Sequence, residues 1–312
     1  MFVNRPHLNL VTQKTALEEL VERYNTRAQA KFYLRQQAVA YDPYQAAHDA
    51  YHEALAVLKA GLPTDTRVRV IDRDFLPTVV FGPDDVVVVL GRDGLVVNAA
   101  KYLHGQPLVG FNPDPARIDG VLLPFRAEQA GAVLAAVLAG RFAADRVTMA
   151  KATLNTGPTL YAVNDLFLGR RGHASARYKL AVGDAQEEQS SSGVIVGTGA
   201  GSTGWLRAVQ AGAAGWVSRK TGTSLRADYA FGRTESRLRF AVREPFPSKT
   251  TAAELVCGWV GAGEELVVTS QMPQGGIIFG DGVEADALEF VSGTVATVTV
   301  ADRVLNLVTR AG

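Results

Sequence analysis

The sequence predicts an α/β domain with a parallel sheet, followed by a β-rich, antiparallel and sandwich-like domain. Helical patterns alternate with short apolar strands in the first part of the chain, as in parallel α/β sheets. From Val147 onward, short alternating segments are separated by turn residues, which is typical of antiparallel β domains. We expect domains at residues 1–125 and 126–290, and a segment at 291–312 that returns to the first domain.

The elements of the first domain follow from hydrophobic periodicity. Apolar residues recur at helical spacing in the early part of the chain, and short β-branched runs follow. The last helix should stop at Gly140, since glycine commonly follows a helix end. The predicted helical regions are 15–58, 95–103 and 127–139, and the predicted strands are 67–71, 86–90 and 107–111.

The composition excludes several classes of protein. The chain has 312 residues, 47% hydrophobic and 20% charged, with a net charge of +1 and no basic stripe, so nucleic acid is not expected as a partner. No apolar run reaches the roughly 18 residues of a membrane span. The single cysteine, Cys257, allows no internal disulfide and fits a reducing cytoplasm. His48 and His52 lie four residues apart, and we interpret them as a helix face rather than a metal site.

The first candidate site follows a buried strand. Val86–Leu90 leads directly into Gly91-Arg92-Asp93-Gly94, and ligands of open α/β sheets gather beyond the carboxyl ends of such strands. The two glycines allow a sharp turn and a close approach of backbone to ligand. The alternative is a plain strand-to-helix turn in which Asp93 caps the helix.

The second candidate site is a glycine-rich loop. Gly199-Ala200-Gly201-Ser202-Thr203-Gly204 matches G-x-G-x-x-G in form, but no clear strand with an acidic end follows, which argues against a Rossmann site. No lysine precedes Ser202, so the loop is not a Walker P-loop either. We expect the loop to offer backbone N–H groups and hydroxyls to an anion or a ribose. A glycine-rich connector capped by Ser202 is the alternative.

With Gly91-Arg92-Asp93-Gly94, Asn164-Asp165, the stretch from Gly197 to Trp205 and the late pair Asp281-Gly282 in this order, the chain resembles the NAD kinase family. The stretches "PLVGFNPDPARIDGVLLPF", "SSGVIVGTGAGSTGW" and "FAVREPF" are similar to its mitochondrial-type branch and the bacterial relatives of that branch. The resemblance covers nearly all of the chain. It implies the NAD kinase/diacylglycerol kinase-like fold, a nucleotide-binding first domain and a dinucleotide-binding second domain.

The resemblance also implies roles for individual residues. Asp93 matches the carboxylate that takes the proton from the 2′-hydroxyl of the adenosine ribose of NAD, and a carboxylate is suited to activate an alcohol in this way. The residues implied to bind nucleotide or phosphate are Gly91, Arg92, Gly94, Gly199, Gly201 and Ser202. Those implied to bind NAD are Asn164, Asp165, Ser192, Thr203, Gly204 and Trp205.

The implied activity is phosphate transfer from ATP to NAD, which forms NADP in the cytoplasm. Mg²⁺ would arrive with ATP, held partly by substrate oxygens, so no dedicated protein metal site is expected. The resemblance further implies a homodimer or larger assembly.

The chain departs from the family pattern at several positions: Thr198-Gly199-Ala200-Gly201 stands for the T-x-T-G of the loop, Asp165 replaces a glutamate and Ser192 replaces an acidic residue. Two further departures lie beside Asp93. Arg92 replaces a glycine and Leu95 replaces a threonine, which favours a catalytically silent dinucleotide-binding homologue as an alternative. A related kinase for a sugar or lipid hydroxyl is a further alternative.

Overall fold

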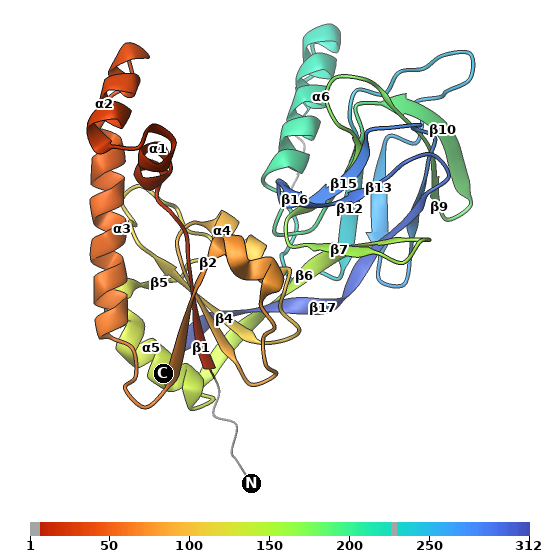
Figure 1. The fold of residues 1–312 in the computed structure, drawn as a ribbon. Coiled ribbons are helices and arrows are strands. Elements are labelled where there is room, and N and C mark those ends of the chain that lie inside the picture. The colour runs from red at the N-terminus through yellow and green to blue at the C-terminus, as the bar shows by residue number, and fades with distance from the viewer. Residues whose placement is uncertain (1–6, 226–229) are drawn as a thin grey trace. The chain divides into compact units, whose positions relative to one another are not determined.

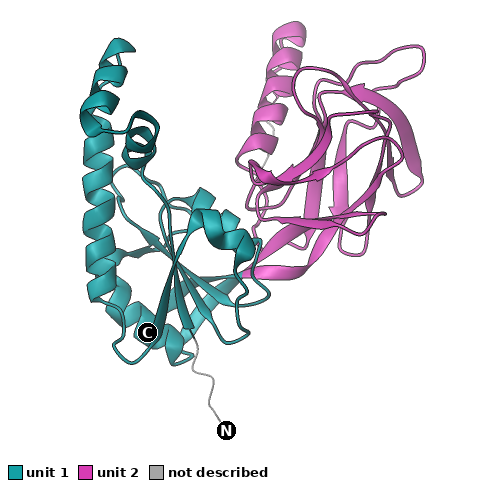
Figure 2. Ribbon diagram, in the orientation of Figure 1, with its two compact units in different colours: residues 1–145, 306–312 teal, residues 146–305 magenta. Residues whose placement is uncertain are grey.

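The structure is a computed structural model that describes residues 7–225 and 230–312. The chain forms two compact units, one of residues 1–145 and 306–312 and one of residues 146–305 (Figure 2). It crosses between them within two long strands, β6 (Phe142–Leu154) and β17 (Val295–Ala311). The crossings thus lie near residues 145 and 305 instead of the expected 125 and 290. A continuous strand shows no break in its residue pattern at the point where it leaves a unit.

The first unit alternates strands and helices (Figure 1). Besides parts of β6 and β17, it contains β1 (His7–Thr12), α1 (Ala16–Tyr24), α2 (Arg27–Gln36), α3 (Asp42–Ala60), β2 (Arg67–Asp72), η1 (Arg73–Thr78), β3 (Val86–Leu90), α4 (Asp93–Ala100), β4 (Pro107–Asn112), β5 (Phe125–Arg126), η2 (Ala127–Gln129) and α5 (Ala130–Leu138).

These strands form the predicted parallel sheet, in the order β2-β1-β3-β4. All five residues of β3 are buried, which explains their unbroken apolar run, because helices cover both faces of such a sheet. Leu10 and Val88 lie in one cluster with Leu58 of α3 and Leu134 of α5. Val87 and Val89 face the opposite side, as alternate residues of a strand do.

The central strand β1 was not predicted from the sequence. This strand pairs with both β2 and β3, but its apolar pattern is broken by Asn9, which is fully buried. Asn9 donates from Nδ2 to Asp85 at 3.0 Å and accepts from Arg69 Nε at 2.7 Å. A buried polar side chain is tolerated when it is hydrogen-bonded, and these partners lie more than fifty residues away in the chain.

The second unit consists of antiparallel strands and one long helix. Its further elements are β7 (Thr159–Ala162), β8 (Asp165–Arg170), β9 (Ala176–Val182), β10 (Ala185–Ser191), β11 (Val194–Gly197), α6 (Trp205–Thr221), β12 (Arg237–Val242), β13 (Cys257–Gly261), β14 (Leu266–Ser270), β15 (Gly276–Gly280) and β16 (Val283–Glu289). One sheet has the order β13-β12-β11-β8-β15-β16, and β10-β9-β14-β17 pair in that order. The end of β17 also pairs parallel with β4 through Asn306 and Leu307, which belong to the first unit.

Both strand groups of the second unit contribute to one core. Val196 and Phe240 from the first group share a buried cluster with Leu180 and Val268 from the second. The predicted α/β domain followed by an antiparallel, sandwich-like β domain is therefore confirmed. Within the described residues, no helix is long and apolar enough to cross a membrane.

Candidate functional site

Asp93 is the first residue of α4, directly beyond the carboxyl end of β3. The N-cap residue is Arg92, so the alternative in which Asp93 caps the helix is not observed. Instead, Asp93 Oδ1 accepts a hydrogen bond from the backbone N–H of Leu122 at 2.7 Å. Among the described residues, this is the only hydrogen bond of the Asp93 side chain. The second carboxylate oxygen is therefore available for a ligand.

The loop that holds Asp93 is built from residues 112–123. Gly110 lies in β4, where a Cβ would overlap the carbonyl oxygen of Leu122. Asn112 donates to the carbonyl of Ile118 at 2.8 Å, and Gly120 turns the chain with a φ of 62°. These contacts fix the N–H of Leu122. The quoted stretch "PLVGFNPDPARIDGVLLPF" thus positions the carboxylate, a role that its residue types did not reveal.

The residues beside Asp93 differ in accessibility. Arg92 and Gly94 are exposed, and a Cβ on Gly94 would meet nothing within 4 Å. Gly91 is buried, and a Cβ there would come within 3.0 Å of Leu95 Cδ2. Leu95 itself is 1% exposed. The residue that replaces the family's threonine is therefore a core residue, and Arg92 is free to reach a ligand.

Asn164 and Asp165 form a turn that is held by Asp281, at the point where β8 begins. The Asp281 carboxylate accepts the backbone N–H groups of Val163 at 3.0 Å and Asn164 at 2.7 Å, with a longer bond from Asp165 at 3.3 Å. The N–H of Asp281 donates to the carbonyl of Asp165 at 2.9 Å. Asp281 is thus a positioning residue. Asp281 belongs to the late Asp281-Gly282 motif, but no role for its side chain was predicted from the sequence.

Asp165 is a buried carboxyl group with a shifted pKa. Its burial, and secondarily the charge of Asp281, raise its pKa from 3.8 to about 7. Burial disfavours the charged form of an acid, and a like charge nearby adds to the effect. Near neutral pH, Asp165 can therefore both donate and accept hydrogen bonds.

The glycine-rich loop packs against the Asn164 turn. A Cβ on Gly201 would overlap the carbonyl oxygen of Asn164, and one on Gly199 would overlap that of Gly232. Ser202 is 1% exposed and donates its hydroxyl hydrogen to the carbonyl of Gly199 at 2.7 Å. Close packing within the protein thus requires these glycines, and Ser202 closes the loop. It does not cap α6, whose N-cap residue is Gly204.

The strands around this loop also rule out a Rossmann unit. β11 precedes the loop and pairs antiparallel with both β8 and β12. A Rossmann site requires a parallel strand–helix–strand unit.

Of the other residues expected to contact NAD, Thr203, Gly204 and Trp205 lie at the end of the same loop, whereas Ser192 precedes β11 and lies at the opposite end of that strand. Thr203 and Gly204 are exposed, and Ser192 is half-buried. The Trp205 ring stacks on Phe167 with centroids 5.5 Å apart, and the Arg243 guanidinium lies 5.3 Å from the Trp205 ring centroid. Trp205 thereby anchors the first turn of α6 to the antiparallel sheet.

The structure therefore gathers the predicted residues into two groups. Arg92, Asp93 and Gly94 form one group in the first unit, with Leu122 as an added member. Asn164, Asp165 and the glycine-rich loop form the other group in the second unit, with Asp281 as an added member.

Comparison with known proteins points to one family, although no protein-family model matches the chain. It is 35% identical over 155 residues to an NAD kinase from Acinetobacter baylyi, a match that covers 47% of this chain and 48% of that protein. It is 34% identical over 130 residues to an NAD kinase from Cupriavidus pinatubonensis, covering 39% and 41%. The matches thus span about half or less of the length of the relatives.

Solved structures show the same fold. The crystal structure of yeast NADH kinase complexed with NADH aligns with a TM-score of 0.59 at 13% identity, covering 100% of this chain and 85% of that chain. An NAD kinase from Archaeoglobus fulgidus in complex with ATP aligns with a TM-score of 0.55 at 16% identity, covering 96% and 92%. The fold that the motifs implied is therefore confirmed, and the partial sequence matches are all to NAD kinases.

Proposed function

We propose that this chain, a relative of the NAD kinase family in sequence and fold, transfers the terminal phosphate of ATP to the 2′-hydroxyl of the adenosine ribose of NAD. The observation that carries the proposal is the Asp93 carboxylate, which lies beyond the end of a buried parallel strand with one oxygen held by Leu122. Such a group is fixed in orientation and still has an oxygen for a substrate proton.

In the proposed reaction, Asp93 accepts the proton of the ribose 2′-hydroxyl while the hydroxyl oxygen attacks the γ-phosphorus of ATP. The bond between that phosphorus and the bridging oxygen breaks, and ADP leaves with the electron pair. General base catalysis of this kind contributes about 10²–10⁴-fold to a rate. The exposed Arg92 would contact the donor phosphates, for which a guanidinium offers paired N–H donors.

We assign dinucleotide binding to the Asn164 turn, Ser192 and the exposed end of the glycine-rich loop. Asp281 fixes the backbone of the turn, so its polar groups are oriented before a ligand binds. Preorganisation of this kind reduces the entropy lost on binding. Because the pKa of Asp165 is raised to about 7, its protonated form would be populated near neutral pH and could donate to a ligand oxygen.

We also propose that ATP is used as its magnesium complex. The described residues contain one group of three or more close histidine, cysteine or acidic side chains, and it combines two imidazoles with one carboxylate. Magnesium prefers oxygen ligands and is commonly held through substrate phosphates. When bound with ATP, the ion would neutralise phosphate charge. We likewise propose that the protein acts in the cytoplasm as a homodimer.

A catalytically silent homologue is the second candidate. A buried leucine, Leu95, stands where the family has a threonine hydroxyl, and the Ser202 hydroxyl is used in a hydrogen bond within the loop, so two hydroxyls that could contact phosphate are lost. This candidate predicts that NAD binds without being converted.

The deciding experiment incubates the purified chain with ATP, Mg²⁺ and NAD, and measures NADP with a coupled NADP-specific dehydrogenase. Parallel reactions replace NAD by NADH, ATP by polyphosphate, or NAD by a sugar or lipid acceptor. Binding of NAD is measured separately by calorimetry. NADP formation supports the proposal, NAD binding without turnover supports the silent homologue, and absence of both rejects NAD as the ligand.

A further inference from the structure

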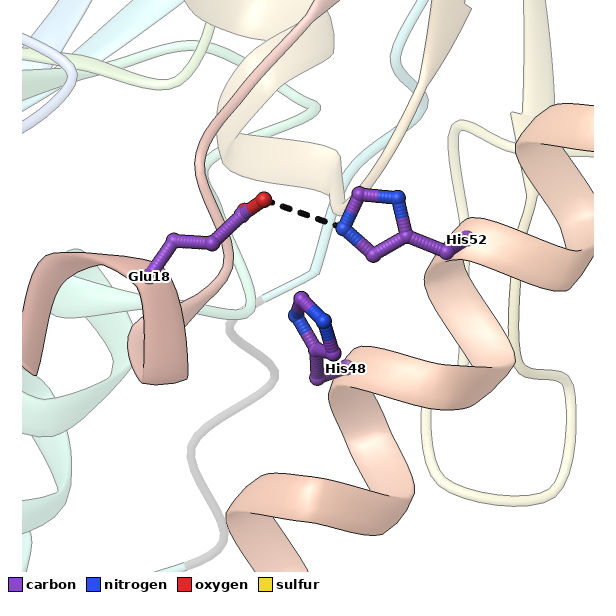
Figure 3. Close-up of side chains that lie close together, drawn as sticks. All are labelled: Glu18, His48 and His52. Carbon is purple, nitrogen blue, oxygen red and sulfur yellow. Dashed lines mark hydrogen bonds and ion pairs between the residues drawn. The ribbon is translucent and has the colours of Figure 1, made fainter. Parts of the chain in front are cut away.

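Three potential metal ligands meet in the first unit, on the facing sides of α1 and α3 (Figure 3). Glu18 comes from α1, and His48 and His52 come from one face of α3. One ligand atom from each residue lies within 4.8 Å of the others. His52 Nε2 is 3.0 Å from Glu18 Oε1, which is near the separation of neighbouring ligands around a bound zinc ion.

Glu18 is held in place through one of its two carboxylate oxygens. Oε2 accepts the backbone N–H of Thr15 at 2.7 Å and the Thr15 hydroxyl at 3.0 Å, forming a capping box for α1. Burial raises the pKa of Glu18, but the hydrogen bonds from Thr15 and the adjacent His52 outweigh it and lower the pKa overall. The carboxylate is therefore ionised, and Oε1 remains for the histidine or for a metal ion.

His48 has a defined tautomer. The guanidinium of Arg27 lies 3.1 Å from His48 Nε2 and can only donate, so Nε2 carries a lone pair and Nδ1 carries the proton. Nδ1 then donates to the Thr15 hydroxyl oxygen at 2.9 Å. Metal-binding histidines are commonly oriented by such a hydrogen bond from the second ring nitrogen. Burial, and next the neighbouring His52, lower the pKa of His48, which favours the neutral form that binds metals.

We propose that Glu18 Oε1, His48 Nε2 and His52 Nε2 bind a divalent transition-metal ion of the zinc class. Two imidazoles and one carboxylate are a common set of protein ligands for zinc, and imidazole ligands select against magnesium. A cavity of about 550 Å³ adjoins the three side chains, so a fourth position is left for water or a small ligand. This site is independent of the proposed kinase reaction, in which magnesium would arrive with ATP.

The Arg27 guanidinium takes up the lone pair of His48 Nε2 in this structure. It is exposed, at the first residue of α2, so its side chain can move into solvent when a metal ion takes the lone pair of His48. Lys14 also lines the cavity, but its ammonium group lies 2.7 Å from Glu22. Arg27 is thus the cation that competes directly for the site, and its removal should strengthen metal binding.

The test is a titration of the chelator-treated full chain with Co²⁺, followed by visible absorption, and with Zn²⁺, followed by calorimetry. Nucleotide is omitted. We expect one ion per chain, and competition of Zn²⁺ with Co²⁺ for the same site. His52→Gln and Glu18→Gln should each weaken binding by at least about tenfold, and Arg27→Gln should strengthen it.

These variants were chosen to keep the fold. The side chain of His52 is 43% exposed, and glutamine at position 18 still supplies a carbonyl oxygen to the capping box. His173→Gln, an exposed histidine in the second unit, serves as the matched control and should bind like the parent chain. The proposal is rejected if the parent chain binds no Co²⁺ at micromolar concentration, or if His52→Gln and Glu18→Gln bind as tightly as His173→Gln.

Discussion

Asp281 holds Asn164 across 117 residues of chain: its Oδ1 accepts the backbone N–H of Asn164 at 2.7 Å. Together with the hydrogen bond from Val163, this contact fixes the turn whose residues are proposed to bind the dinucleotide. The same carboxylate helps to raise the pKa of Asp165. One side chain therefore fixes the geometry of this part of the site and adds to the effect of burial on the pKa of Asp165.

The first prediction concerns Asp281→Asn. Asparagine tolerates the positive φ of 55° at this position but lacks the charge and one acceptor oxygen. Losing one partner of a buried hydrogen bond costs about 1–3 kcal/mol, so the thermal unfolding midpoint should fall and NAD affinity should weaken. Circular dichroism melting and calorimetry measure both. An unchanged midpoint together with unchanged affinity would show that Asp281 does not position the turn.

The second prediction concerns pH and Asp165. Its folded-state pKa of about 7 lies above the unfolded value of 3.8, so between these values the folded chain keeps a proton that the unfolded chain has released. Asp165 therefore contributes stability that is present at low pH and is lost as the pH rises towards 7.

Urea unfolding from pH 4 to 8 checks this contribution. Asp165→Asn should remove it, so the difference in unfolding free energy between parent and variant should change across the window and level off above about pH 7. A constant difference across the window would contradict the shifted pKa.

The third prediction concerns Asp93→Asn. The side-chain oxygen of asparagine can still accept the N–H of Leu122, so the loop and the fold should persist. Without a carboxylate base, turnover should fall by roughly 10²–10⁴-fold while nucleotide binding stays largely intact. Steady-state kinetics and calorimetry separate the two effects, and full activity of the variant would remove Asp93 from the mechanism.

The fourth prediction concerns Arg92, which is exposed beside Asp93. If it contacts the donor phosphates, Arg92→Gly should raise KM for ATP, and lysine should be a poor substitute because it lacks the paired N–H donors. If it blocks the donor, Arg92→Gly should instead raise activity. We expect the first outcome; a faster Arg92→Gly enzyme, with ATP concentration varied, would refute it.

The fifth prediction compares two glycines. In Gly201→Ala the new methyl group would overlap the carbonyl of Asn164, and overpacking of this kind costs about 1–3 kcal/mol. Gly212 lies within α6, where a Cβ meets nothing within 4 Å, so Gly212→Ala should stabilise the chain by about 0.5–1 kcal/mol. Denaturant unfolding should give opposite signs for the two variants, and equal effects would exclude close packing as the role of Gly201.

The sequence predicted the elements whose burial is continuous and local. Val86–Leu90 is β3 without any change in bounds, because a strand covered on both faces is apolar at every position. The helix after it begins at Asp93 instead of Leu95, since residues of the first turn need not be apolar. Asp93 lies at the start of α4, directly after the strand as its motif placed it, whereas Asn164 and Asp165, which the pattern "YAVNDLFLG" placed within one strand, lie at a turn where β8 begins.

The sequence by itself determined the fold class and the order of the motifs, because periodicity records which face of each element is buried. Only the tertiary structure decided which groups meet. The hydrogen bonds that tie distant parts of the chain together are Asn9 to Asp85, Asp93 to Leu122, Asn164 to Asp281, and Glu18 to His52. Buried polar groups must find hydrogen-bond partners, but a partner far away in the chain leaves no periodic pattern. It is set by how strands and loops pack in space.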